Sequence, residues 1–344
     1  MDLLNLDGLW ITDPYSIHFL IGIHLDTMER FSALLLRPQQ KPLLLVNLLF
    51  GIEATEDFEV LNFHDADDVS AIMKSLVLGK NLGVDKYMRA QELLPLLDSY
   101  NITIASDLVD KLRAIKSKEE IEKMKVASLI NDQVMEKVPS LLKVGVSEKE
   151  VADQIEDLFK DLGADGLSFD TIVAFGENCA DPHAIPSDRK LKDNEAIIID
   201  MGCIKDGYCS DMTRSFIMGH NELMEELYHL VNKANKEAFN SIRTGMTFSQ
   251  LDKVARDVIG AQYKNEFNHR LGHGIGQSTH EPYDVSASNH ALIEPGMCFS
   301  IEPGIYLKGV GGIRIENLVY IDEDGNGVLL NHVDQDNPWL NNKG

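Results

Sequence analysis

A nine-residue pattern occurs twice in this chain, one hundred residues apart, and constrains its fold more than any other feature. Residues Lys143–Val151 and Arg243–Leu251 both read basic, any, glycine, apolar, hydroxyl, any, any, acid or amide, apolar. Such a segment ends one helix at glycine and starts the next with a capping box. Chance is the alternative, because capped helices recur in many proteins and a nine-residue match is short.

Extending the register aligns acidic residues in the two copies. Leu191–Asp200 then stands against Ile293–Glu302, and Asp211 falls near Glu316. Agreement at two acidic positions argues against coincidence. We therefore expect two copies of a helix-helix-strand-strand unit related by a pseudo-two-fold axis. Four carboxylates near that axis are what a dinuclear metal site needs.

The chain is long enough for two domains, because single cores stop growing at about 250–300 residues and this sequence has 344. Short strand-like runs at Ser32–Leu36, Leu43–Val46 and Ile102–Ile104, with a leucine-rich helix at 91–99, predict a small α/β domain over residues 1–110. The pattern then changes, and residues 111–344 are expected to form the second domain.

A long amphipathic helix is expected to open that second domain. Ser117 and Glu120 form a capping box, and apolar residues follow at helical spacing at 121, 124, 127, 130 and 134. Together the two segments predict a fold of the α/β (α+β) class.

The charge balance excludes some partners. The 32 basic and 55 acidic residues give a formal charge of −23, which repels nucleic acid and anionic lipid surfaces. The first ten residues lack the pattern of a secretory signal, and the longest apolar run, Pro42–Ile52, is too short for a membrane span. Four cysteines without CxxC spacing predict reduced thiols in a cytoplasmic protein.

Two acidic residues are expected to meet on neighbouring strands. Ala196–Met201 is a continuous apolar run containing Asp200, as in a buried strand, and a buried carboxylate is costly unless it is paired or binds a cation. Gly202–Tyr208 resembles a hairpin turn, which would return Asp211 close to Asp200. Asp211 could instead form a surface ion pair with Arg214.

The second copy supplies further candidate ligands. Strict alternation over Ile313–Asn317 puts Arg314 and Glu316 on one side, and Glu302 precedes a Pro-Gly pair. His273 lies between glycines that let backbones approach closely. Such an oxygen-rich set suits manganese better than a thiolate zinc centre. Taken alone, Glu302 could be a turn residue, and single histidines in this stretch are more often structural.

Several ordered motifs carry a family resemblance. The segments IIIDMG, SDMTRSF, HRLGHGIGQSTHEP, SIEPGIY and GIRIEN resemble those of the pita-bread metallopeptidases, in particular the bacterial prolidases (Xaa-Pro dipeptidases). The likeness covers residues 110–325, and residues 1–108 more loosely resemble the creatinase-type amino-terminal domain. It implies a curved antiparallel sheet flanked by helices, a homodimer, and a two-metal hydrolase that cleaves the peptide bond before proline.

The resemblance also implies residue roles. The family's five metal ligands correspond to Asp200, Asp211, His273, Glu302 and Glu316, with Asp211 and Glu316 bridging. The resemblance also assigns Glu302 as the general base, which takes a proton from the metal-bridging water and so produces the hydroxide nucleophile. The remaining catalytic positions, which handle substrate and the tetrahedral intermediate, correspond to His183, His269, His280 and Arg314. The implied cofactor is two divalent ions, Mn²⁺ first, with Co²⁺ or Zn²⁺ as alternatives.

Substrate recognition separates the remaining alternatives. A dipeptidase needs a cation for the substrate carboxylate, and Arg270 resembles the prolidase version of its motif, although it could be a plain surface arginine. The loop Asp26-Thr27-Met28-Glu29-Arg30 resembles one that caps the partner subunit's active site in bacterial prolidases, which implies substrate-binding roles for Asp26, Glu29 and Arg30. It lacks that loop's usual histidine, a departure that bears on the capping contacts and the substrate range but not on the metal chemistry. The alternatives are an aminopeptidase P acting on longer peptides, and a non-catalytic binding protein, which would be expected to have lost ligands.

Overall fold

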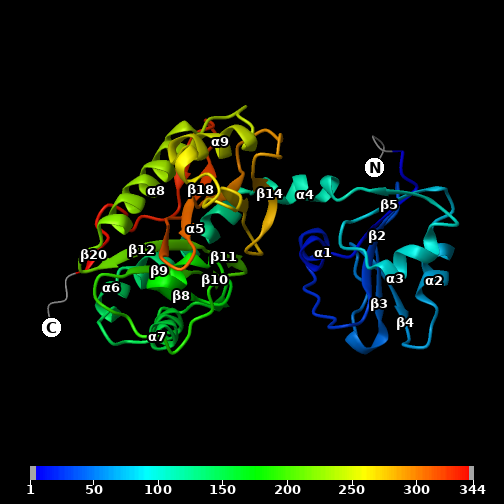
Figure 1. The fold of residues 1–344 in the computed structure, drawn as a ribbon. Coiled ribbons are helices and arrows are strands. Elements are labelled where there is room, and N and C mark those ends of the chain that lie inside the picture. Colours follow the sequence, from blue (N-terminus) through cyan, green and yellow to red (C-terminus); the bar gives the residue numbers. More distant parts are fainter. Residues whose placement is uncertain (1–4, 341–344) are drawn as a thin grey trace. The chain divides into compact units, whose positions relative to one another are not determined.

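The computed structural model describes residues 5–340, and they fall into two compact units that divide between Arg113 and Ala114. Figure 1 traces the chain through both units. Both mix helices and strands, which is the expected fold class.

The amino-terminal unit is built on a six-stranded mixed sheet in the order β4-β3-β2-β1-β5-β6. Its strands are β1 (Gly8–Ile11), β2 (Ser32–Leu36), β3 (Leu43–Asn47), β4 (Glu59–Phe63), β5 (Asn81–Val84) and β6 (Asn101–Ile104). Its helices are α1 (Pro14–Ile21), α2 (Val69–Leu76), α3 (Ala90–Leu93) and α4 (Asp107–Ala114), with short 3₁₀ turns at η2 (Leu48–Phe50) and η3 (Leu94–Leu96).

Both faces of this sheet are buried, which explains the continuous apolar runs of its central strands. Leu35 and Leu45 pack in one cluster with Met73 of α2, whereas Leu34 and Leu44 pack in the cluster that includes α1. Alternate side chains of a strand point to opposite faces, so a sheet covered on both sides needs apolar residues at every position.

One helix of this unit is shorter than the sequence pattern predicts. The expected helix over 91–99 consists of α3, which ends at Leu93, and the 3₁₀ turn Leu94–Leu96. Pro95 has no amide hydrogen to continue the α-helical hydrogen bonds. The three expected strands are confirmed as β2, β3 and β6.

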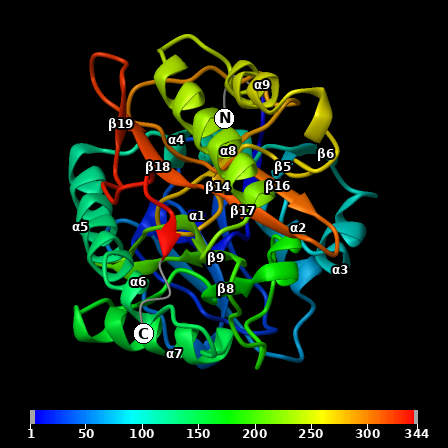
Figure 2. The same ribbon diagram turned by 60° about the vertical axis from the view of Figure 1, so that its left-hand side comes forward.

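The second unit contains five α-helices among the described residues: α5 (Lys118–Met135), α6 (Val138–Leu141), α7 (Glu148–Asp161), α8 (Glu222–Ser241) and α9 (Phe248–Ile259). In Figures 1 and 2, α9 lies near the top of this unit, α8 runs down from that end, and α7 lies at the bottom, below β8 and β9. The predicted capping box of Ser117 and Glu120 is present at the start of α5.

The strands of this unit are mainly antiparallel and fall into four sheets. One has the order β20-β12-β9-β8 and another β14-β13-β15-β18-β19; the smaller two are β11-β10-β7 and β16-β17. Their bounds are β7 (Gly166–Leu167), β8 (Ile172–Phe175), β9 (Ala196–Met201), β10 (Cys203–Lys205), β11 (Tyr208–Cys209), β12 (Met212–Met218), β13 (Gly272–Gly274), β14 (Glu281–Val285), β15 (Cys298–Ile301), β16 (Gly304–Leu307), β17 (Gly311–Arg314), β18 (Asn317–Ile321), β19 (Gly327–Leu329) and β20 (Trp339–Leu340). Turns η4 (Gly176–Ala180) and η5 (Ala261–Tyr263) complete it.

The predicted internal repeat is visible in matched contacts. Ser147 and Thr247 each head a helix with a complete capping box. Each also forms an isolated antiparallel bridge to the segment that follows it, at Lys190 and Leu292 respectively.

Helix α5 and helix α8 hold the two copies in the same way. The Asn131 side chain of α5 donates to the Met201 carbonyl at 3.0 Å, and the Asn235 side chain of α8 donates to the Ile301 carbonyl at 2.8 Å. Residues 201 and 301 adjoin Asp200 and Glu302. Both copies therefore use a buried asparagine to fix a strand beside an acidic residue.

Strand β9 packs between two apolar clusters, and Asp200 lies near its end. Ile197 and Ile199 pack in the cluster under α7, and Ala196 and Ile198 pack in the cluster under α8 and α9. β9 pairs antiparallel with β12, which places Thr213 opposite Asp200. The expected hairpin is confirmed as β10 and β11, and it brings Asp211 back to the start of β12.

The carboxyl-terminal segment differs from its polar sequence, which predicts a loose tail from Asn331. Asn331 is buried and accepts the Leu318 amide at 2.6 Å. Tyr228 donates to the Gln335 carbonyl at 2.7 Å, and β20 pairs with β12. That expectation is wrong for residues 331–340, because the polar side chains satisfy buried groups of the core; residues 341–344 lie outside the described part.

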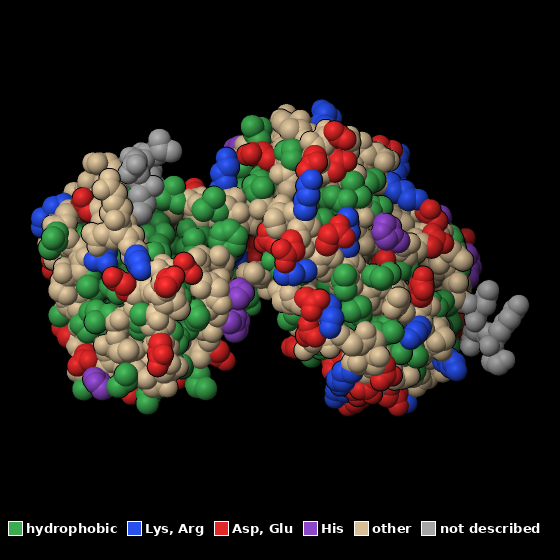
Figure 3. All heavy atoms as spheres, turned by 180° about the vertical axis from the view of Figure 1, so that it is seen from behind, with side chains coloured by type: hydrophobic (Ala, Val, Ile, Leu, Met, Phe, Trp, Pro, Cys, Tyr) green, Lys and Arg blue, Asp and Glu red, His purple; other side chains and the backbone are tan. Residues whose placement is uncertain are grey.

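The surface and the cysteines agree with the composition. Acidic and basic side chains are intermixed over the face in Figure 3, and all four cysteines are free and buried. Within residues 5–340, no helix combines the length and the apolar character that a membrane span requires.

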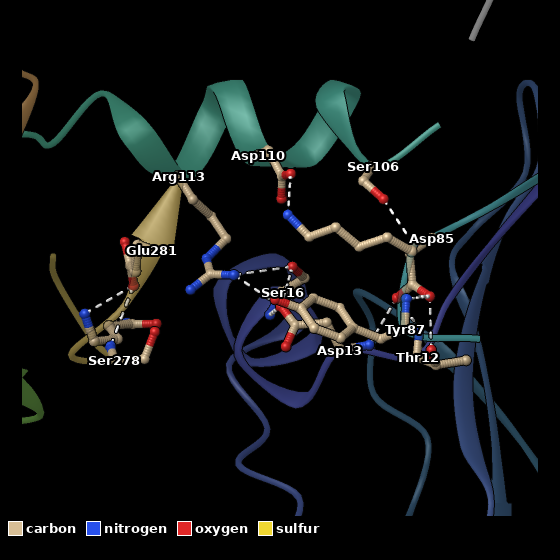
Figure 4. A network of polar contacts seen from close by, with 12 residues as sticks. Thr12, Asp13, Ser16, Asp85, Tyr87, Ser106, Asp110, Arg113, Ser278 and Glu281 are labelled. Atoms are coloured by element: carbon tan, nitrogen blue, oxygen red, sulfur yellow. Dashed lines mark hydrogen bonds and ion pairs between the residues drawn. The ribbon is translucent and has the colours of Figure 1, made fainter. Parts of the chain in front are cut away.

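Helix α4 is held onto the amino-terminal unit by two ion pairs (Figure 4). Arg113 donates to Asp13 at 2.8 Å, and Lys86 donates to Asp110 at 2.8 Å. Asp13 also caps the amino terminus of α1. The last helix of this unit is thereby joined to its first.

Candidate metal centre and active site

A pocket of about 790 Å³ in the second unit contains most of the predicted site. Its walls combine one apolar side with a dense set of ionisable groups. The lining residues are Phe169, Asp170, Thr171, Ile172, Pro182, His183, Ala184, Ile185, Pro186, Asp200, Asp211, His269, Arg270, His273, Thr279, His280, Glu302, Arg314 and Glu316.

Three of the five expected metal ligands already converge on one point. Single ligand atoms of Asp211, His273 and Glu316 all lie within 4.8 Å of one another. From Nε2 of His273 the distances are 3.6 Å to Asp211 Oδ2, 3.6 Å to Glu302 Oε1 and 4.0 Å to Glu316 Oε1. A cation of the size of Mn²⁺ bridges atoms at such separations.

The expected ligands come from the ends of strands in both copies of the repeat. Asp200 lies near the end of β9, Asp211 precedes β12, and Glu302 follows β15. Glu316 lies between β17 and β18, and His273 is the central residue of β13. The expected ligands thus come together only when the two copies pack against each other.

The glycines around His273 are required by close backbone contacts. A Cβ at Gly272 would lie 1.9 Å from the Ser300 carbonyl oxygen, and a Cβ at Gly274 would lie 2.5 Å from that of Pro282. No side chain can occupy either position without displacing backbone. This is the close approach that the Gly-His-Gly pattern predicts.

Among the described residues, several carboxylate oxygens of this cluster have no partner in the protein alone. Asp200 Oδ1, Asp211 Oδ1 and Glu316 Oε1 are buried with no hydrogen-bond partner in the described part of the chain. Burial, followed by the charges of the neighbouring carboxylates, raises the pKa of both Asp211 and Glu316 well above the usual range. Burial is also the main cause that raises the pKa of Glu302 to about 7. A divalent cation removes this repulsion, so the residues present fit one.

His273 is a neutral imidazole with one ring nitrogen turned toward the carboxylates. Its Nδ1 lies 3.1 Å from the Gly274 carbonyl oxygen, to which it donates, and this leaves Nε2 as an acceptor facing the carboxylates. Burial lowers its pKa to about 3. The Ser300 hydroxyl accepts the His273 amide and donates to Glu302 at 3.2 Å, which joins two of the expected ligands.

Arg314 orients a carboxylate at the edge of the cluster. Its guanidinium donates to Asp200 Oδ2 at 2.7 Å, to Thr213 Oγ1 at 3.0 Å and to the Pro182 carbonyl at 3.2 Å. Thr213 in turn donates to Glu316 at 2.9 Å. This arginine therefore connects ligands of both copies and the loop at Pro182.

His269 uses both ring nitrogens within the protein. Nδ1 lies 2.7 Å from the Arg270 carbonyl oxygen and so carries the hydrogen, and Nε2 accepts from the Tyr306 hydroxyl at 3.0 Å. The same hydroxyl oxygen accepts from Arg314 at 2.9 Å. Burial lowers the pKa of His269 to about 4, so it stays neutral. Its contacts are those of a group that fixes Tyr306 and Arg314.

His183 and His280 stand at the pocket wall with fewer restraints. His183 is exposed, and its amide donates to Asp181 at 2.9 Å. His280 packs edge-on to His273 with ring centroids 4.3 Å apart, and burial lowers its pKa. Both imidazoles line the pocket.

Arg270 lines the pocket but already has a partner. Its guanidinium forms an ion pair with Asp284 of β14. An incoming carboxylate must compete with that aspartate.

The three loop residues expected to bind substrate belong to the amino-terminal unit. Arg30 forms ion pairs with Glu29 at 2.9 Å and with Asp65 at 3.1 Å, and Asp26 accepts the Met28 amide at 3.3 Å. The pocket itself is lined by residues of the second unit.

The sequence pattern did not single out three groups that hold this site. Tyr306, Thr213 and Ser300 each bond directly to an expected ligand or to a residue that orients one. All three lie within four residues of an expected ligand, which is the one signal that could have identified them. A hydroxyl near a cluster of acids is otherwise too common to be informative.

Comparison with known proteins agrees with this geometry. Residues 122–323 match metallopeptidase family M24, and residues 1–115 match the creatinase/prolidase amino-terminal domain. An uncharacterized peptidase of Staphylococcus epidermidis is 36% identical over 336 residues, which is 95% of each chain.

Solved structures of prolidases and dipeptidases are also similar. The dipeptidase PepE of Mycobacterium ulcerans superimposes with a TM-score of 0.90 at 32% identity, covering 99% of this chain and 95% of its own. A prolidase of Thermococcus sibiricus gives a TM-score of 0.88 at 32% identity, covering 97% and 95%. The chain belongs to the M24 metallopeptidases and carries an amino-terminal domain of the creatinase/prolidase type.

Proposed function

We propose that this metallopeptidase is an Xaa-Pro dipeptidase that holds two divalent ions, most readily Mn²⁺, in the pocket described above. The observation that carries the proposal is the set of buried, unpaired carboxylate oxygens around His273. Similarity to prolidases and dipeptidases supports the choice of substrate.

Five residues would hold the ions: Asp200, Asp211, His273, Glu302 and Glu316. Asp211 and Glu316, whose pKa values are both raised by burial and by neighbouring carboxylates, would share the two cations. The oxygen-rich set favours manganese, with cobalt or zinc as alternatives. When bound, such ions lower the pKa of water and supply the nucleophile near neutral pH.

The side chains then divide the remaining work. Glu302 accepts the proton of the attacking water and returns it to the leaving nitrogen. His280 and His183 donate to the carbonyl oxygen as negative charge develops on it. His269 acts at one remove by holding Arg314 through Tyr306.

Substrate recognition uses the other pocket walls. Phe169, Ile172 and Ile185 offer an apolar surface to the proline ring, which has no amide hydrogen to donate. Arg270 binds the carboxylate of the dipeptide by leaving Asp284.

We further propose a cytoplasmic homodimer whose domains are 1–110 and 111–344. The four free cysteines support a reducing compartment. In such a dimer Asp26, Glu29 and Arg30 would contact substrate bound by the partner subunit.

One assay tests the function directly. Protein loaded with Mn²⁺ should release proline from Leu-Pro or Met-Pro, and Glu302→Gln should reduce the rate by about 10²- to 10⁴-fold, the usual contribution of a general base. Undiminished activity of the variant would refute the mechanism.

A second candidate is an Xaa-Pro aminopeptidase acting on longer peptides. The observation in its favour is the Arg270–Asp284 ion pair, which occupies the cation that a free dipeptide carboxylate needs. Cleavage of Xaa-Pro-Xaa tripeptides without release of proline from dipeptides would select this alternative.

A further inference from the structure

A fully buried carboxylate lies outside the metal centre, at the first residue of α7. Glu148 has 0% of its surface exposed. Burying a charge costs free energy unless hydrogen bonds compensate for it. Its compensation is unusually complete: its two oxygens accept five hydrogen bonds, donated by Phe175, Asn178 and Ser187.

These donors stand at the two ends of one loop, residues 176–187. At the entrance, Glu148 Oε1 accepts the Phe175 amide at 2.8 Å and the Asn178 side chain at 2.9 Å. At the exit, Oε2 accepts the Ser187 amide at 3.0 Å and its hydroxyl at 2.6 Å. One side chain therefore closes the loop at its base.

The loop between these ends forms a wall of the pocket. It contributes a run of consecutive lining residues, from Pro182 to Pro186, and His183 is among them. The side chains of His183 and Ile185 are exposed, so burial does not hold them in place and their position follows that of the loop backbone. Helix α7 packs beside β8, where the loop begins (Figure 2).

Backbone hydrogen bonds hold the exit of the loop to α7 more firmly than they connect the exit to the entrance. Amides of Glu148 and Lys149 donate to the carbonyls of Arg189 and Ser187, both at 3.1 Å. These bonds tie the exit to α7. The hydrogen bonds from α7 to Phe175 and Asn178 are accepted by the Glu148 carboxylate.

The second copy of the repeat shows that the fold alone does not demand an acid here. The residue that follows the capping Thr247 is Phe248, which is buried in the apolar core. An apolar side chain thus serves the same structural position. What distinguishes the first copy is the loop that Glu148 closes.

We propose that Glu148 is a positioning residue that holds His183 and its loop at the substrate. The proposal rests on the proposed function, in which His183 contacts the scissile carbonyl. It assigns to a side chain of α7, outside the pocket lining, control over the placement of a pocket wall.

Glu148→Gln is the direct test, because four of the five bonds come from N–H donors. The side-chain amide of the glutamine would turn its NH₂ toward one end of the loop. There a donor would face the hydrogen-bond donors of the loop, and those bonds would be lost. We expect kcat/KM for Leu-Pro to fall about 10- to 100-fold, the scale of an ångström-sized misplacement. Glu150→Gln is the matched control: its carboxylate bonds to the capping Ser147 of the same helix, and it should leave kcat/KM within about twofold.

A double-mutant cycle separates positioning from general damage. In a His183→Ala background, Glu148→Gln should have little further effect on kcat/KM, because both changes remove the same contact. Fully additive losses would overturn the proposal. If Glu148→Gln does not fold, Ser187→Ala removes one of the exit bonds and enters the same cycle.

Hydrogen exchange gives a readout that does not need catalysis. Amides of residues 175–187 should exchange faster in Glu148→Gln than in the wild type or in Glu150→Gln, with the other segments unchanged. Unchanged exchange in that loop would also overturn the proposal. If no Xaa-Pro peptide is cleaved but exchange rises locally, the proposed function fails while the loop anchor stands.

Discussion

The Arg314 guanidinium donates to Asp200 Oδ2 at 2.7 Å, whereas Oδ1 of the same carboxylate is buried without a hydrogen-bond partner in the described chain. One oxygen is therefore held by the protein, and the other is the oxygen that the proposed metal ion would contact. Arg314 makes three further hydrogen bonds, to Thr213, Tyr306 and the Pro182 carbonyl, so its geometry is fixed from several sides.

Arg314→Lys should weaken Mn²⁺ binding by about 10- to 100-fold, the usual effect of losing a group that orients a ligand. Lysine keeps the charge but cannot reproduce the planar set of donors, so the change isolates geometry. Titration calorimetry measures the affinity. Arg189→Lys, which alters the Arg189–Glu195 pair, should bind Mn²⁺ normally; equal weakening in both variants would refute the orienting role.

The raised pKa of Glu302 predicts that the stability of the metal-free protein depends on pH. Its folded pKa of about 7 lies above the ordinary 4.5, so the folded state binds more protons than the unfolded state between these values. Stability from this group is complete below pH 4.5 and is lost as the pH rises through 7. The total loss is on the order of 3 kcal/mol, at about 1.36 kcal/mol per pH unit.

Glu302→Gln should remove that loss. With a chelator present, the variant should gain stability relative to the wild type between about pH 5 and pH 8 in urea unfolding, and Mn²⁺ should reverse the order at about pH 8. The exposed Glu237 of α8 provides a control, since Glu237→Gln should show no such trend. A constant difference between the Glu302→Gln variant and the wild type would contradict the pKa assignment.

Arg270 and Asp284 form an ion pair, and we expect substitutions of these two residues to change KM in opposite directions. Arg270→Ala should raise KM for Leu-Pro about 10- to 100-fold, the scale of a charge-assisted hydrogen bond. Asp284→Asn should lower KM, because the arginine no longer has a competing carboxylate. Neither substitution should change KM for a substrate whose carboxyl group is amidated. Steady-state kinetics with Leu-Pro and with the amidated substrate would reveal any general loss of activity.

Asn235 should contribute more to stability than its counterpart Asn131. Its side chain donates to the Ile301 and Ile315 carbonyls and accepts from Asn317 and Gln335, whereas Asn131 donates to Met201. Asn235→Ala should cost about 2–4 kcal/mol and Asn131→Ala about 1–2 kcal/mol, from the buried groups left unsatisfied. Urea unfolding of both variants tests this order.

The internal repeat was predictable because its signal is local. A glycine, a capping hydroxyl and an acid or amide three residues later determine the start of a helix through short-range hydrogen bonds, and both Ser147 and Thr247 behave in this way. The acids of the repeat were informative for a related reason: a carboxylate such as Asp200 at the end of a buried strand needs a partner.

The contacts that position the site were not predictable in the same way. Tyr306 meets His269 across 37 residues, and Glu148 meets Ser187 across 39. Tyrosine and glutamate are unremarkable at these positions in the sequence, and their importance depends on loops whose course no local pattern specifies. The burial of Asn331 was missed for the same reason, because polarity predicts exposure unless the partner is known.

The contacts between the two copies of the repeat have a consequence for folding. Thr213 of the first copy bonds to Glu316 of the second, and Arg314 of the second bonds to Asp200 of the first. Neither half contains the complete set of expected ligands, so we expect a separated half to gain little stability from the metal. Metal binding therefore reports whether the two halves have assembled. If the chain is divided between β12 and α8, the two fragments should retain Mn²⁺ only when they are mixed. The ion should then make their association cooperative.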